Sequence, residues 1–254
     1  MNSLWSPANS GNLQAFSKSS GGATSDTWAM DSYRNKEAND TCCLGADEAG
    51  ALLAGAPWRR LLVMGDSIAA GIGDPVDGYL DLGWADRLAA ALAAAYLNVG
   101  RAGAHAVEVR EGQLGQALAF GPDLAVVAAG ANDAFRRSFA APAVEAELER
   151  IVSALSNAGS LVVTFGCFDL GRTSFLPPER RAGLSARLHD LGRLTEEICR
   201  RHGGIHVDFL RHPALDDGLL SADRLHINRR GHAIVAAEVI RALSRRLAGR
   251  AVQR

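Results

Sequence analysis

The fold is decided by residues 61–68, which read LLVMGDSI. The first four residues are an apolar run, which is typical of a short strand buried on both faces of a sheet. The glycine and the polar residues that follow it indicate a turn at the end of that strand. From this stretch to the C-terminus, short apolar runs alternate with longer segments of helical periodicity, so the sequence predicts alternating strands and helices.

Five strands and five helices are predicted in this alternation. The strands are expected at residues 61–64, 97–99, 124–128, 161–165 and 205–209, and the helices at residues 82–95, 105–120, 142–157, 178–201 and 229–249. Asn228 suits the N-cap of the last helix. Strands separated by helices are joined by right-handed crossovers, which gives an α/β fold with a five-stranded parallel sheet covered on both faces. In such sheets the functional residues lie in loops at the carboxyl ends of the strands.

Residues 1–56 differ in composition from the rest of the chain. They are rich in Ser, Asn and Gly, and their aromatic residues follow no helical or strand period. Such a segment buries too little apolar area to offset its loss of conformational entropy. We therefore predict a disordered or non-core N-terminal leader at residues 1–56, or a translated region upstream of the true start, and a folded domain at residues 57–254. Removal of residues 1–50 is expected to leave the melting temperature nearly unchanged.

Composition and charge exclude several classes of protein. Hydrophobic residues make up 48% of the chain, which is enough for a substantial core. The 27 Lys and Arg residues nearly balance the 28 Asp and Glu residues, so the sequence predicts no nucleic-acid partner, which would select a basic surface. No apolar run reaches the roughly 20 residues of a membrane span, and the N-terminus does not resemble a secretory signal.

The cysteines and histidines do not predict a metal site. The four cysteines have no zinc-binding spacing, and we expect them to be free thiols in a reducing compartment, which favours a cytoplasmic location. No cluster of His, Cys or carboxylate residues has the spacing of metal ligands, so we expect neither a metal nor a cofactor.

Candidate catalytic residues follow the predicted strands. Ser67 follows the first strand at a strand-to-helix turn, where the N-terminus of the next helix would offer backbone donors. Gly103 follows the second strand, and Asn132, whose amide can complete an oxyanion hole, follows the third. Asp223 lies three residues before His226, a spacing at which a carboxylate can orient an imidazole that takes a proton from a serine. Each feature alone is also typical of an ordinary turn or a surface salt bridge, so the inference depends on their occurrence together.

Together these residues resemble the four motif blocks of the SGNH hydrolase family, also called GDSL esterases and lipases. The blocks are Gly65-Asp66-Ser67, Gly103, Gly130-x-Asn132-Asp133 and Asp223-x-x-His226. The resemblance covers about residues 59–249 and implies a flavodoxin-like three-layer α/β/α fold. It also implies that Ser67 is the nucleophile, that His226 is the general base and that Asp223 orients it. The oxyanion hole would consist of the Ser67 and Gly103 backbone amides and the Asn132 side chain.

The implied reaction is hydrolysis of a carboxylic ester through an acyl-enzyme intermediate. The expected substrate is a small-molecule ester with a short acyl group, because no long apolar lid follows the strands, although residues 168–178 could form a small flap. Three alternatives stay open, namely an acyltransferase with the same residues, a lysophospholipase or thioesterase acting on lipids, and a non-catalytic binding protein. Asp66 and Asp133 are expected to hold turns, and His105 either lines the pocket or has a structural role.

Overall fold

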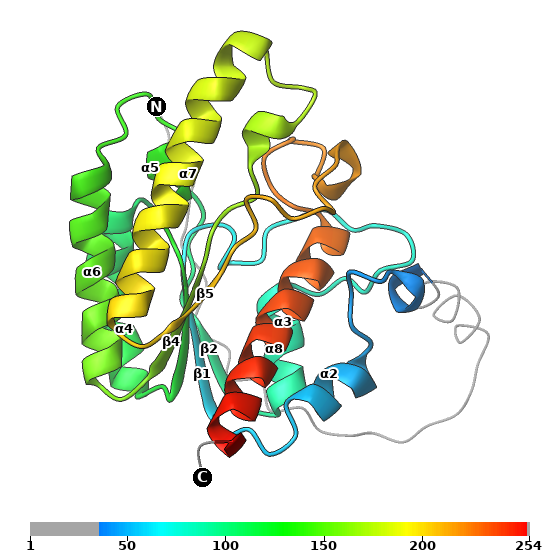
Figure 1. The fold of residues 1–254 in the computed structure, drawn as a ribbon, viewed down its shortest axis with the longest axis vertical. Coiled ribbons are helices and arrows are strands. Elements are labelled where there is room, and N and C mark those ends of the chain that lie inside the picture. Colours follow the sequence, from blue (N-terminus) through cyan, green and yellow to red (C-terminus); the bar gives the residue numbers. More distant parts are fainter. Residues whose placement is uncertain (1–35, 253–254) are drawn as a thin grey trace, which may run out of the picture.

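The computed structural model describes residues 36–252 and has a parallel β-sheet at its centre (Figure 1). Its strands are β1 (Arg60–Gly65), β2 (Ala95–Asn98), β3 (Leu124–Ala128), β4 (Leu161–Phe165) and β5 (Ile205–Val207). All neighbouring strands pair in parallel, and their order across the sheet is β2-β1-β3-β4-β5. This order is that of a flavodoxin-like fold, so the predicted fold class and the five-stranded parallel sheet are confirmed.

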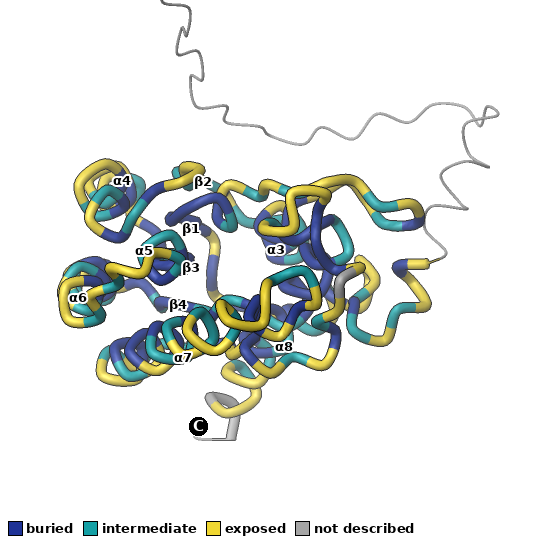
Figure 2. The backbone as a smooth tube through the Cα atoms, turned by 90° about the horizontal axis from the view of Figure 1, so that it is seen from above, coloured by how far each residue is buried: buried dark blue, intermediate teal, exposed yellow. Residues whose placement is uncertain are grey.

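Helices cover both faces of the sheet and give the molecule three layers (Figures 1 and 2). One face carries α4 (Ala106–Phe120), α6 (Ala141–Asn157) and α7 (Pro178–Arg201), and the other carries α3 (Trp84–Leu92) and α8 (Arg229–Val252). Shorter elements are α2 (Ala46–Leu52), α5 (Ala131–Ala134) and the 3-10 turns Leu170–Arg172 and Asp217–Leu219. All of β3, and all of β1 after its first residue, is buried between the layers, as unbroken apolar runs require.

The predicted elements are present, and some of their ends differ. β3, β4 and α7 occupy the residues predicted from the sequence. β5 ends two residues earlier than expected, because the Asp208 carboxylate accepts a hydrogen bond from the Leu210 amide at 2.8 Å and turns the chain. The expectation that Ser67 lies at the N-terminus of the next helix is wrong, since residues 67–71 form turns and the next helix, α3, begins at Trp84. Among the described residues, no helix is long and apolar enough to cross a membrane.

Residues 36–56 pack against the domain, which differs from the prediction of a non-core leader at residues 1–56. Cys43, Ala49 and Leu53 are buried in the main hydrophobic cluster, and α2 contacts both α3 and α8. Ala49 and Leu53 are four residues apart and so lie on one face of a single helical turn, a pattern too short to show as periodicity. Residues 1–35 lie outside the described residues, so the prediction for that part stays a prediction.

Polar side chains fix this segment to the rest of the domain. The Glu37 carboxylate forms a buried ion pair with Arg87 of α3, and Glu37 Oε2 lies 3.1 Å from Arg87 Nη2. Asp40 accepts a hydrogen bond from the Tyr79 hydroxyl at 2.7 Å and pairs with Arg230 of α8 at 2.8 Å. These contacts conflict with the expectation that residues 36–50 can be removed without loss of stability.

Replacing Glu37 with alanine is expected to lower the free energy of unfolding by about 3 kcal/mol, because Arg87 would stay buried without its counter-charge. The two side chains are only 9% and 10% exposed, so solvent screens the pair weakly. The matched control is Glu48→Ala, which removes an exposed carboxylate from α2 and should change stability by less than about 0.5 kcal/mol. Urea denaturation measures both variants. Equal stability of the two would show that this segment does not support the domain.

Candidate active site

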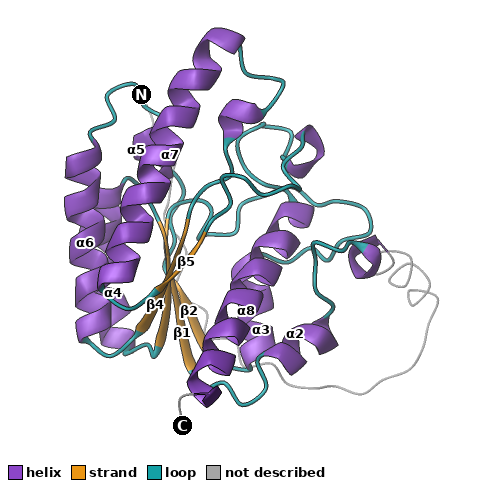
Figure 3. Cartoon of the chain, viewed as in Figure 1, coloured by secondary structure: helices purple, strands orange, loops and turns teal. Residues whose placement is uncertain are grey.

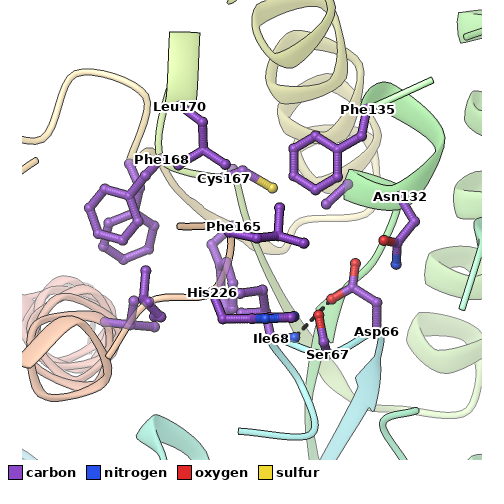
Figure 4. Close-up of a pocket in the computed structure, with 16 residues that line it drawn as sticks. Asp66, Ser67, Ile68, Asn132, Phe135, Phe165, Cys167, Phe168, Leu170 and His226 are labelled. Carbon is purple, nitrogen blue, oxygen red and sulfur yellow. Dashed lines mark hydrogen bonds between the residues drawn. The ribbon is translucent and has the colours of Figure 1, made fainter. Parts of the chain in front are cut away.

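A pocket lies at the carboxyl end of the sheet, where the loops after β1, β3 and β4 meet the segment before α8 (Figure 4). Figure 3 shows the loops at this end of the strands. Ser67, Asn132 and His226 all line this pocket, so the structure brings together three of the five predicted site residues. Asp66 also lines it, and most of the remaining wall is apolar. The wall consists of Ile68, Ala131, Phe135, Phe165, Gly166, Cys167, Phe168, Leu170, Phe209, Leu225, Ile227 and Val235.

The position of Ser67 is set by the end of β1. Gly65 has a φ of +141°, and a Cβ atom at this position would lie 1.8 Å from the Ala128 carbonyl oxygen of β3, so only glycine fits. The Asp66 amide donates a hydrogen bond to the same carbonyl at 2.9 Å. The chain therefore leaves β1 close against β3 and places Ser67, which is 8% exposed, at the base of the pocket.

Two further side chains hold this turn, and the sequence did not identify either of them. Gln113 is buried in α4, and its amide group bonds the Gly65 N–H and the Gly65 carbonyl, both at 2.8 Å. The Trp84 indole N–H donates to the Ile68 carbonyl at 2.7 Å from a fully buried position. A polar Gln113 on the buried side of a helix was the available sequence signal for a structural hydrogen bond. Trp84 carries no such signal, because in the sequence it looks like an ordinary core residue.

Asp223 and His226 form a hydrogen-bonded pair. Asp223 Oδ2 lies 2.5 Å from His226 Nδ1, and Asp223 Oδ1 accepts hydrogen bonds from the Leu225 and His226 amides at 2.9 and 3.0 Å. The carboxylate therefore holds the Nδ1 proton, which leaves Nε2 as the proton acceptor. Figure 4 draws His226 and Ser67 among the residues that line the pocket.

The Asp223 carboxylate is ionised throughout the ordinary pH range. Its partial burial acts to raise its pKa, but the hydrogen bonds from the His226 ring and from the Leu225 and His226 amides outweigh this effect and lower the pKa to about 2. A carboxylate that keeps its charge can orient the imidazole and stabilise it once it has taken up a proton.

The two other predicted oxyanion donors are placed differently from each other. Asn132 lines the pocket, and its Nδ2 donates one hydrogen bond to the Ala104 carbonyl at 3.0 Å, which orients the amide and leaves its second N–H available. Gly103 is exposed, has a φ of +73° and is not among the residues that line the pocket. Its amide lies in the loop next to Ala104, so a contact with a bound oxyanion stays a prediction.

The predicted turn-holding role of Asp66 is confirmed, whereas Asp133 instead holds the distant N-terminus of α4. Asp66 Oδ1 accepts a hydrogen bond from the Ile68 amide at 3.0 Å, and Asp133 Oδ2 accepts one from the Ala106 amide at 3.0 Å. His105 does not line the pocket, because its Nδ1 faces Asp133 Oδ1 at 3.3 Å. Among the described residues, no three His, Cys, Asp or Glu side chains are arranged to hold a metal ion.

Residues 63–234 match the GDSL-like Lipase/Acylhydrolase family, which is more than half of the chain. The chain belongs to this family. Membership makes it a carboxylic ester hydrolase, in agreement with the presence of Ser67 and His226 in one pocket.

Solved structures with the same fold include esterases and lipases. A lipase/acylhydrolase from Enterococcus faecalis is 22% identical with a TM-score of 0.59, and the match covers 74% of this chain and 96% of that one. A single-residue variant of an acetyl xylan esterase, Axe2, from Geobacillus stearothermophilus is 21% identical with a TM-score of 0.59, over 73% and 94% of the two chains. The psychrotrophic esterase EstA from Pseudoalteromonas sp. is 17% identical with a TM-score of 0.58, over 75% and 99%. No curated protein matches the chain.

The Asp66 carboxyl should make stability depend on pH. Burial raises its pKa to about 7, against the opposing effects of the Ile68 amide and of His226. Because the unfolded-state value is about 4, the folded protein holds the extra proton, and the stabilisation is fully present below about pH 4 and lost as the pH rises through about 7.

The measurement compares the wild type with Asp66→Asn, which keeps an oxygen for the Ile68 amide and is neutral at every pH. Between about pH 5 and pH 8, the stability of the wild type relative to this variant should fall by about 3 kcal/mol. Other titrating groups are common to both proteins and cancel. A difference that stays constant with pH would mean that Asp66 is already ionised at pH 5.

Proposed function

We propose that the protein hydrolyses small-molecule esters with short acyl groups, and that Ser67 carries the acyl group between the two half-reactions. The observation that carries this proposal is the Asp223–His226 pair in contact with a pocket that also presents Ser67. A serine needs such a base to become a nucleophile at neutral pH, and the base needs a third group to fix its orientation. No bound metal or cofactor has a part in the proposed reaction.

In the first half-reaction, Ser67 Oγ attacks the ester carbonyl carbon while His226 Nε2 takes the hydroxyl proton. The carbonyl oxygen becomes an oxyanion, stabilised by the Ser67 amide, the free N–H of Asn132 and the Gly103 amide, at about 3 kcal/mol for each well-placed donor. The bond between the carbonyl carbon and the alcohol oxygen then breaks, and His226 gives its proton to the leaving alcohol. Water repeats the sequence on the acyl-enzyme and releases the acid.

The apolar part of the pocket supports a short acyl group. Phe165 and Phe209 line the pocket, and Phe165 packs edge-to-face against both Trp84 and Phe209, with ring centroids 5.2 and 5.8 Å apart, which fixes this part of the wall. Phe168 and Leu170 are buried, so this part of the 168–178 loop is a fixed wall. The cavity volume is about 50 Å³, and the pocket is partly open to solvent, so only a small group can be buried in it.

Ser67→Ala should keep the fold but lower kcat by at least about a thousandfold, because no acyl-enzyme can form without the Ser67 hydroxyl. The control is Ser138→Ala, which removes an exposed hydroxyl outside the pocket and should leave kcat unchanged. A fluorophosphonate probe should label the wild type and not the Ser67 variant. Turnover by a folded Ser67→Ala protein would exclude Ser67 as the nucleophile, and a wild type that the probe does not label would favour a binding protein.

Acetyl to butyryl esters should be cleaved with higher kcat/KM than decanoyl esters, because a longer chain cannot be buried in the pocket. Val235→Ala should widen the apolar end, so that longer esters gain about fourfold in kcat/KM for each methylene newly buried. Val239→Ala is the matched control, since Val239 lies one turn further along α8, is fully buried and does not line the pocket. The p-nitrophenyl ester series measures all three proteins.

Two outcomes of that series would change the assignment. A kcat/KM that rises steadily from acetate to decanoate in the wild type would indicate a lysophospholipase or thioesterase and would overturn the short-chain proposal. Formation of a new ester in the presence of a competing alcohol, faster than release of the free acid, would identify an acyltransferase.

A further inference from the structure

The acid–base pair is carried by a small hairpin. Leu220 and Ile227 form an antiparallel bridge, and the Ser221 amide donates to the His226 carbonyl at 2.8 Å. We call residues 219–228 the acid–base hairpin, because Asp223 and His226 both lie on it. Its tip contains Arg224 in the left-handed region, with a φ of +57°. A residue other than glycine keeps this conformation only where its surroundings hold it, so the hairpin needs external support.

Asp74, in the loop between the turn at residues 66–71 (the nucleophile turn) and α3, contacts the chain on both sides of the Asp223–His226 pair. Its Oδ2 accepts a hydrogen bond from the Ala222 amide at 2.8 Å, and its own amide donates to Ser221 Oγ at 2.9 Å. Its carbonyl accepts a hydrogen bond from the Arg229 amide at 3.0 Å. Ala222 directly precedes Asp223, and Arg229 lies three residues after His226, so one residue holds the chain on both sides of the pair.

The neighbours of Asp74 bring the two segments into close contact. A Cβ atom on Gly73 would lie 2.2 Å from the Ile227 carbonyl oxygen, which shows how tightly the loop presses on the hairpin. Pro75 fixes its own φ and restricts Asp74 to extended conformations, so the backbone donor and acceptor of Asp74 are preorganised. Arg229 Nη1 also donates to the Gly71 carbonyl at 2.9 Å. The loop that begins at the nucleophile turn therefore packs against the hairpin and is hydrogen-bonded to it.

We infer that Asp74 is a positioning residue, whose carboxylate holds Asp223 and His226 in register with Ser67. The inference rests on the proposed function, since it assigns Asp74 a role through that pair. Without the Ala222 contact, the strained tip at Arg224 can relax, and Asp223 moves relative to the imidazole. Catalysis depends on such placement, and a displacement of about 1 Å can cost two orders of magnitude in rate.

Asp74→Ala should lower kcat about tenfold and leave KM within about twofold, because the substrate pocket is not touched. Asp74→Asn keeps an oxygen for the Ala222 amide and should restore most of the rate. Asp77→Ala is the matched control, since Asp77 is an exposed carboxylate in the same loop that forms no hydrogen bond or ion pair with residues 36–252. Asp74 is itself exposed, so all three variants should keep melting temperatures within about 2 °C of the wild type.

A second measurement reads the acid–base pair directly and needs no turnover. The short His226 Nδ1–H···Asp223 hydrogen bond should give a strongly deshielded proton resonance that is lost in His226→Ala. That resonance should shift or broaden in Asp74→Ala and stay in place in Asp74→Asn and Asp77→Ala. Unchanged kcat and an unchanged resonance in Asp74→Ala would overturn the inference, as would equal losses in Asp74→Ala and Asp77→Ala. Failure of the proposed function would instead show in the Ser67→Ala experiment.

Discussion

The absence of a side chain at Gly65 is the constraint on which the site depends. β1 lies between β2 and β3, and its last residue approaches Ala128 so closely that a Cβ atom would overlap the carbonyl oxygen. A larger residue would separate the ends of β1 and β3, and these ends carry Ser67 and Asn132. Gly65 therefore sets the distance between the proposed nucleophile and a predicted oxyanion donor, and it does so through backbone contact alone.

A buried chain of hydrogen bonds connects the turn after β1 with α8, the helix that follows His226. His232 of α8 is fully buried, its Nδ1 accepts from the Trp84 amide at 3.3 Å, and its Nε2 lies 3.1 Å from the Ile72 carbonyl. This pattern requires a neutral imidazole with its proton on Nε2, and burial correspondingly lowers the pKa of His232 to about 4. The Trp84 indole also donates to the Ile68 carbonyl, so Trp84 connects the turn that carries Ser67 with α8, which follows His226.

Strands and candidate site residues could be predicted from the sequence wherever a short motif of polar residues follows an apolar run. The apolar runs located the five strands, and Ser67, Asn132, Asp223 and His226 were found because each lies in a short motif at a strand end or before the last helix. Contacts between distant segments left no such signal, which is why Gln113, Asp74 and the packing of residues 36–56 were missed. No helix begins at Ser67, because Gly71, Gly73 and Pro75 break helical structure in the loop between β1 and α3.

Two carboxyl groups near His226 have opposite environments, and the difference suits the proposed chemistry. Asp223 is about half exposed and has its negative charge stabilised by three N–H donors, so it supports a positive charge on the imidazole at any working pH. Asp66 is 2% exposed and lies in the pocket where the oxyanion would form, and its burial favours the protonated state. A second negative charge at that position would repel the oxyanion in a medium that screens it poorly. The Asp66 carboxyl oxygen accepts the hydrogen bond of the Ile68 amide that the turn needs. Because burial favours the protonated carboxyl, this oxygen is supplied with less of the negative charge that would oppose the transition state.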